Sequence, residues 1–151
     1  KVKTKVKFIE KFSKFADYVI INGLIKKEMV KQHAHILENI KICGPENNLD
    51  AMDIANEDIK VFTKKIIKAK TVFWNGPFGR FEEKKYKNGT LAIAKAIIKS
   101  KAFSVVGGGE TVEFLKKEGI LNKFNYVSTG GGAMLSYLSG DDLPGLKALD
   151  K

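Results

Sequence analysis

Two apolar segments in the second half of this chain each end in three consecutive glycines. The first is Ser104-Val-Val-Gly-Gly-Gly-Glu-Thr111 and the second is Tyr126-Val-Ser-Thr-Gly-Gly-Gly-Ala133. Each begins as a strand-type run and continues into a helical pattern. Because glycine has no side chain, such a turn lets the backbone approach a ligand closely and direct its N–H groups at an anion. Two such turns on successive strands predict a phosphate-binding edge.

Short apolar strands alternate with helical patterns along the whole chain. We expect strands at 18–21, 40–43, 71–74, 103–106 and 124–127, and helices at 7–15, 26–39, 56–68, 89–99, 110–118 and 131–138. This alternation is typical of βαβ units, so we predict an α/β fold of three layers, αβα, with a Rossmann-like parallel sheet and helices on both faces. Since crossovers are right-handed, the turns after the strands meet along one edge, where open α/β sheets bind ligands.

The composition is that of one globular domain, or one lobe of a larger protein. The chain has 151 residues, of which 44% are hydrophobic, enough for a real core. No run of eighteen apolar residues is present, so we expect no membrane-spanning helix. The single cysteine, Cys43, excludes an internal disulfide framework and fits a reducing cytosol, so we expect a cytoplasmic protein.

The net charge of +10 first suggests a nucleic-acid partner. The details argue against one. The only arginine is Arg80, and the lysines are spread along the chain, whereas base-edge and bidentate phosphate recognition favour arginine. We therefore expect a solvated lysine-rich surface and no nucleic-acid partner, although the positive field can help attract an anionic metabolite.

The least ordinary stretch is Trp74-Asn-Gly-Pro-Phe-Gly-Arg-Phe-Glu82. Asn75 places a polar group at the carboxyl end of a strand, Pro77 fixes a loop, and Phe78 offers an apolar surface to a ring. Glu82 can accept hydrogen bonds from ribose hydroxyls. The alternative is an aromatic-rich turn that completes the core, with Glu82 on the surface.

The first glycine turn leads into a helix that starts with a carboxylate. It matches neither a Walker A loop nor a Gly-x-Gly-x-x-Gly fingerprint. Glu110 lies where a metal bound to phosphates can sit. The alternative is a tight turn in which Glu110 is only a first-turn acid that is favourable to the helix dipole.

The second glycine turn, 128–132, combines hydroxyls with bare amides at a helix start. Such a nest can stabilise charge on a transferring phosphoryl group. The alternative is an ordinary N-cap by Ser128 or Thr129, but three glycines are more than a cap needs, so we favour the functional interpretation.

Two other pairs of residues are less specific. Lys1 and Lys5 are four apart and so share a side of a helix, but a solvated basic end explains them as well. His33 and His35 are two apart on an expected helix, where they do not face each other. With no cysteine nearby, we interpret them as surface residues.

Taken together, these stretches resemble the C-terminal, nucleotide-binding lobe of the phosphoglycerate kinase family. The stretches that carry the resemblance are 1–6, 73–82, 89–90, 107–111, 127–133 and 143–145. The resemblance implies a kinase that moves a phosphoryl group between 1,3-bisphosphoglycerate and ADP, with Mg²⁺. It also implies that an N-terminal lobe binds the phosphoglycerate while this lobe, residues 1–151, binds ADP or ATP. We expect a monomer, and we expect the isolated lobe to be inactive.

The resemblance also assigns roles residue by residue. It implies catalytic roles for Lys1, Gly130, Gly131 and Gly132, and a metal-binding role for Glu110. It implies nucleotide binding by Lys5, Asn75, Pro77, Phe78, Glu82, Gly107, Gly108, Gly109, Glu110 and Thr111.

The chain departs from the family pattern at four places. The family usually has Asp where Glu110 stands, and Asp-Ile-Gly where this chain has Asp53-Ile54-Ala55. Segments present in the family are absent near 23–24 and 42–53, which removes part of the adenine pocket. We expect that loops were left out of the sequence there rather than lost from the protein.

Two alternatives remain open. One is another α/β nucleotide or dinucleotide binder, which would need a Gly-x-Gly-x-x-Gly after the first strand. The other is a basic nucleic-acid-binding module, whose binding would depend on salt and resist competition by ADP.

Overall fold

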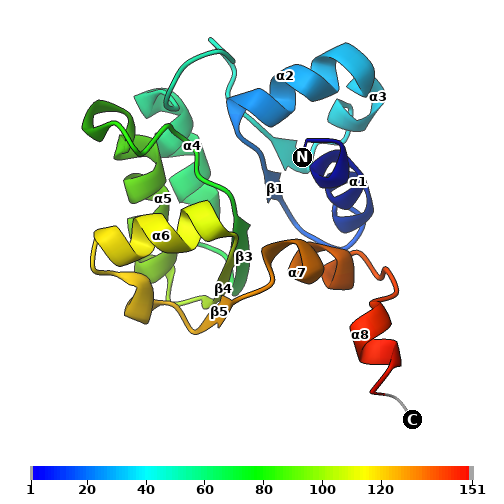
Figure 1. The fold of residues 1–151 in the computed structure, drawn as a ribbon. Helices are drawn as coiled ribbons and strands as arrows, with labels where there is room; N and C mark the ends of the chain where they lie inside the picture. The colour runs from blue at the N-terminus through cyan, green and yellow to red at the C-terminus, as the bar shows by residue number, and fades with distance from the viewer. Residues whose placement is uncertain (1, 150–151) are drawn as a thin grey trace.

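The structure, a computed structural model, describes residues 2–149 (Figure 1). The strands are β1 (Val19–Ile20), β2 (Ile42–Cys43), β3 (Thr71–Asn75), β4 (Phe103–Gly107) and β5 (Tyr126–Ser128). The α-helices are α1 (Val2–Phe12), α2 (Gly23–Gln32), α3 (Ala34–Leu37), α4 (Asn56–Ile66), α5 (Asn88–Ser100), α6 (Gly109–Lys117), α7 (Gly131–Leu138) and α8 (Pro144–Lys147). The described residues also form two 3₁₀ turns, Lys84–Tyr86 and Leu121–Lys123.

All described strand pairs are parallel, as the βαβ alternation predicts, and helices flank them. The strands form two sheets and not the single sheet that we expected: β1 pairs with β2, and β3-β4-β5 form a second sheet. Aromatic side chains separate the facing strands β1 and β3. Phe8 and Phe12 of α1 and Phe73 of β3 line the space between them, and the rings of Phe12 and Phe73 meet edge to face at 6.0 Å.

Each sheet has its own hydrophobic core. Around β3 and β4, the buried side chains include Phe62, Ile93, Val106, Phe114 and Leu115. Around β1, the buried side chains include Val6, Ile9, Val19, Ile25 and Met29. In Figure 1, α1, α2 and α3 gather beside β1, and α4, α5 and α6 gather beside β3.

The helices of the β3–β5 half agree with the predicted positions, whereas two earlier ones differ. Helix α1 starts at Val2 and not at Lys7, so Lys5 lies inside it. The helix predicted over 26–39 is two helices, because the backbone of His33 leaves helical geometry at φ −142° and ψ 35°. This break brings the rings of His33 and His35 to 6.5 Å, edge to face. The prediction that they do not face each other is therefore wrong.

The backbone passes without interruption through both places where the family pattern has more residues. Asn22 leads directly into α2, and its side-chain Oδ1 accepts from the Ile25 N–H at 3.0 Å to cap that helix. Among the described helices, none has the length and apolar character needed to cross a membrane.

Candidate functional site

The carboxyl ends of β3, β4 and β5 lie side by side. Asn75 is in register with Gly107, and Gly107 is in register with Ser128. The three turns that follow these strands therefore share one edge, as the sequence predicts. Helices α6 and α7 both start there.

The two glycine turns are in direct contact. A Cβ added at Gly131 would lie 2.7 Å from the backbone nitrogen of Gly108 and 2.8 Å from its Cα. Gly108 has φ +91°, a left-handed conformation that favours glycine. Close packing thus requires glycine at 131 and backbone geometry requires it at 108.

Neither helix start at this edge has a side-chain cap. The N-cap residues are Gly108 for α6 and Gly130 for α7, and neither helix receives a capping hydrogen bond from a side chain. The alternative of an ordinary N-cap by Ser128 or Thr129 is therefore wrong. Backbone N–H groups at the start of a helix lack intrahelical partners and suit an anion.

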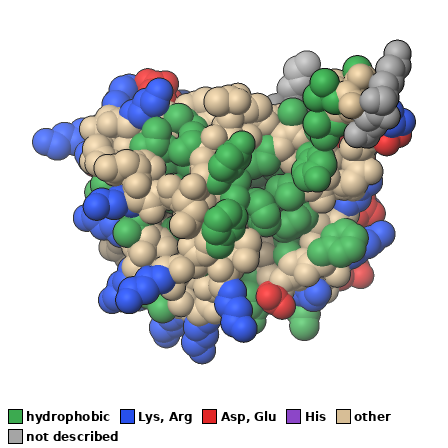
Figure 2. All heavy atoms as spheres, turned by 90° about the horizontal axis from the view of Figure 1, so that it is seen from below, with side chains coloured by type: hydrophobic (Ala, Val, Ile, Leu, Met, Phe, Trp, Pro, Cys, Tyr) green, Lys and Arg blue, Asp and Glu red, His purple; other side chains and the backbone are tan. Residues whose placement is uncertain are grey.

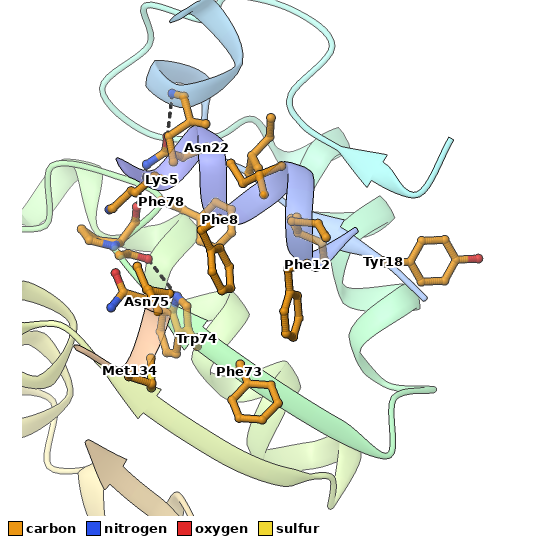
Figure 3. A pocket seen from close by; sticks show the side chains of 18 residues that line it. Lys5, Phe8, Phe12, Tyr18, Asn22, Phe73, Trp74, Asn75, Phe78 and Met134 are labelled. Atoms are coloured by element: carbon orange, nitrogen blue, oxygen red, sulfur yellow. Dashed lines mark hydrogen bonds between the residues drawn. The ribbon is translucent and has the colours of Figure 1, made fainter. Parts of the chain in front are cut away.

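Asn75 lies at the contact between the two glycine turns, and Lys5 lies beside the turn after β3. The Asn75 side-chain Nδ2 lies 3.5 Å from the carbonyl oxygen of Gly131, to which it donates. The half-buried Lys5 points from α1 toward the turn after β3, and its Nζ lies 3.0 Å from where a Cβ of Gly76 would be (Figure 3). This arrangement combines a lysine charge with uncapped amides. Lys1 lies outside the described residues.

Pro77 and Phe78 border a cavity of about 130 Å³ beside Lys5 and Asn75 (Figure 3). The Asn22 side-chain Nδ2 donates to the Pro77 carbonyl oxygen at 3.2 Å and so ties this loop to the end of β1. The Phe78 ring packs on Phe62 at 5.9 Å. The loop is therefore held from both cores.

Two buried threonine hydroxyls hold the turn after β3. The Thr111 Oγ1 accepts from the Gly76 N–H at 2.8 Å. The Thr90 Oγ1 accepts from the N–H groups of Phe78 at 3.1 Å and Gly79 at 3.2 Å. Both side chains are fully buried. The family resemblance implies a role for Thr111 but none for Thr90, although the Gly89-Thr90 pair is among the stretches that carry the resemblance.

The two candidate acidic residues are both exposed. Glu82 does not line the cavity, while its neighbour Phe81 is buried against Phe114 at a ring distance of 5.3 Å. Glu110 lies in the first turn of α6. Within residues 2–149, no three His, Cys, Asp or Glu residues form a metal cluster. A single carboxylate fits Mg²⁺, which commonly binds one or two carboxylates together with substrate phosphates.

Sequence patterns did not single out Asp53, although its side chain accepts two backbone hydrogen bonds. Its Oδ2 accepts from the Gly89 N–H and its Oδ1 from the Ile54 N–H, both at 2.9 Å. Burial raises the pKa of this carboxyl above its usual range, and backbone hydrogen bonds oppose the rise. The available signal was the family-like segment Asp53-Ile54-Ala55.

Known proteins match this chain in sequence and in fold. The family model described as phosphoglycerate kinase matches residues 26–141. A phosphoglycerate kinase from Solibacter usitatus is 48% identical over 107 residues, which cover 71% of this chain and 27% of that protein. One from Anaeromyxobacter dehalogenans is 31% identical over 196 residues, which cover all of this chain and 50% of that protein.

A solved structure agrees with these sequence matches. The structure of phosphoglycerate kinase from Coxiella burnetii superposes with a TM-score of 0.86 at 29% identity, covering 99% of this chain and 50% of that one. The chain thus spans at most about half the length of these proteins. The family match and the sequence relatives show that this chain belongs to the phosphoglycerate kinase family.

Proposed function

We propose that this chain is the C-terminal, nucleotide-binding lobe of a phosphoglycerate kinase and that it binds ADP or ATP with Mg²⁺. The proposal rests on one observation: the turns after β3, β4 and β5 meet in register, with Lys5 beside them and two helix starts without side-chain caps. This arrangement offers amides and one lysine to phosphate oxygens. Phosphoryl transfer depends mainly on positioning and charge stabilisation, which such a site provides.

The individual roles that we propose are those that the family resemblance assigns. Lys5 and Asn75 contact the nucleotide phosphates, together with the amides of the first glycine turn, 107–111. Gly130, Gly131 and Gly132 face the phosphoryl group in transfer. Pro77 and Phe78 border the nucleotide, and Glu82 holds the ribose. Glu110 binds Mg²⁺, which neutralises phosphate charge when it is bound.

The complete reaction needs residues beyond this lobe. The resemblance assigns the phosphoglycerate site to an N-terminal lobe, so we expect these 151 residues alone to bind nucleotide as a cytoplasmic monomer without turnover. A coupled kinase assay on the chain checks this, and normal activity would refute it. The match to the Anaeromyxobacter relative runs over 196 residues where this chain has 151, which is consistent with segments absent from this sequence. Intact mass tests whether the protein has the 16.8 kDa of this sequence.

Calorimetric titration with ADP and Mg²⁺ tests the site. Lys5→Ala should weaken binding about tenfold or more, because a hydrogen bond to a charged group contributes about 1.5–3 kcal/mol. Lys7→Ala is the matched control: it removes the same charge from the exposed side of α1 and should leave affinity nearly unchanged. Equal losses in both variants would reduce the role of Lys5 to a general charge effect.

Two other ligands, NAD and an oligonucleotide, test the alternative functions of the chain. NAD that stabilises the chain more than ADP does would favour a dinucleotide binder. Salt-dependent binding of an oligonucleotide that ADP does not displace would favour a nucleic-acid module. A thermal shift with ADP and Mg²⁺ alone is the result that we expect, since a ligand of the folded state raises its stability.

A further inference from the structure

Asp53 lies where three separate segments meet. Its carboxylate accepts from Ile54 in its own segment and from Gly89 at the start of α5. Next to it, the Arg80 N–H donates to the Met52 carbonyl oxygen at 2.7 Å, which fastens the loop after β3 to the same segment. The half-buried Asp53 carboxylate thus joins the segment before α4 to the start of α5, and a backbone hydrogen bond joins the same segment to the loop after β3.

Two glycines leave the space that the Asp53 carboxylate occupies. A Cβ at Gly79 would lie 2.4 Å from Asp53 Oδ1, and a Cβ at Gly89 would lie 2.3 Å from the same atom. Real Cβ atoms do not approach an oxygen so closely. The carboxylate therefore fills the space that side chains at 79 and 89 would otherwise occupy.

Thr90, the residue after Gly89, connects the start of α5 to the loop after β3. Thr90 is fully buried, and its hydroxyl accepts from the N–H groups of Phe78 and Gly79. Asp53 fixes the backbone at Gly89, Gly89 fixes the position of Thr90, and Thr90 fixes the loop that follows Pro77. No side chain in this series needs to touch a ligand.

We propose that Asp53 is a positioning residue for the nucleotide site and that it sets the loop 77–79 through Gly89 and Thr90. This inference rests on the proposed function only in its ligand readout. Asp53 itself contacts Gly79 and Gly89, and it acts on the site through these two residues.

Affinity for ADP with Mg²⁺ provides the first test. Asp53→Asn replaces one acceptor oxygen by a donor and should weaken binding about tenfold, and Thr90→Val should do the same. If both act on one loop, the double variant should lose little more than either single variant, since residues in one network are not additive. Losses that multiply to about a hundredfold, or an unchanged affinity in Asp53→Asn, would overturn the proposal.

Asp58→Asn is the matched control. Asp58 is also buried, and its Oδ1 accepts from the backbone N–H of Glu46 at 3.2 Å, away from the loop. It should lower stability without changing the ADP dissociation constant of the folded protein. An equal loss of affinity in Asp58→Asn would mean that general loosening, and not the loop, explains the effect.

Amide hydrogen exchange gives a readout that needs no ligand. In Asp53→Asn the amides of Phe78 and Gly79 should exchange about tenfold faster, while that of Val106 should change only with global stability. If the unmodified protein binds no ADP, the proposed function fails but this measurement still decides the role of Asp53. If Asp53→Asn does not fold, Asp53→Ser, which keeps a smaller acceptor, takes its place. Unchanged exchange at Phe78 and Gly79 would refute the role.

Discussion

The two ends of strand β3 are built in opposite ways. At its carboxyl end, small residues and directed hydrogen bonds join the turns: Gly131 packs on Gly108, and Thr111 and Thr90 hold the backbone from 76 to 79. At its amino end, bulky apolar side chains surround a groove of about 860 Å³ between β1 and β3. Figure 2 shows hydrophobic side chains gathered near the centre of the face seen from below.

The contacts around the groove are weaker and less directional than those at the carboxyl end of β3. Phe15, Tyr18 and Phe73 are 78%, 50% and 39% exposed there. The Lys65 ammonium lies over the Tyr18 ring at 3.7 Å. Regions with few buried contacts open at lower free energy than a packed core. The chain thus concentrates its directed contacts at the carboxyl end of β3, and the following variants test that difference.

The largest effect should come from crowding the contact between the two glycine turns. Gly131→Ala puts a methyl 2.7 Å from backbone and should cost about 2–3 kcal/mol of unfolding free energy, because backbone must shift. Gly132→Ala meets nothing within 4 Å and should be neutral or stabilising by up to about 0.5 kcal/mol. Urea denaturation measures both. Similar costs would show that the carboxyl end is not tightly packed.

The next effect should come from removing the buried hydroxyl behind the turn. Thr111→Val leaves the Gly76 N–H without its partner and should cost about 2 kcal/mol. Thr111→Ser keeps the hydroxyl and should cost about 1 kcal/mol for the lost methyl. The same denaturation series compares them. A valine variant as stable as the serine variant would show that this hydrogen bond does not stabilise the fold.

A pH series tests the half-buried carboxyl of Asp53 at the same end. Because the pKa of Asp53 is raised by burial, folding favours its protonated form. Its contribution to stability is fully present below the unfolded value of 3.8 and is lost as pH rises through the folded value. Asn cannot titrate, so Asp53→Asn should gain stability relative to the unmodified protein as pH rises through this window. Parallel curves would contradict the raised pKa.

The smallest effect should come from the groove. Lys65→Ala removes the contact with Tyr18 and should cost about 0.5 kcal/mol, the size of an exposed cation–π pair. Lys64→Ala removes an equal charge from an exposed neighbouring position and should cost less. A loss of about 2 kcal/mol in Lys65→Ala would make the two ends of β3 more alike than the contacts suggest.

Much of the geometry of the candidate site could be predicted from sequence, because it depends on the order of the strands and on the positions of glycines. The ends of β3, β4 and β5 could be predicted to meet from βαβ handedness alone. Lys5 needed the resemblance, because its helix could not be oriented from spacing. Asp53 and Thr90 act across 36 and 11 residues of chain, respectively, and no local pattern reveals such contacts. The division into two sheets is a tertiary arrangement, with Phe8, Phe12 and Phe73 lining the space between β1 and β3, and periodicity does not encode it.

The hydrogen bond from Asn22 to Pro77 joins the first core to the loop after β3, beside Lys5. The same side chain caps α2, because its Oδ1 accepts from the Ile25 N–H. One amide group therefore serves both the start of a helix and the loop at the candidate site. A change at Asn22 would remove both hydrogen bonds at once, so the start of α2 and the loop at the site depend on the same residue.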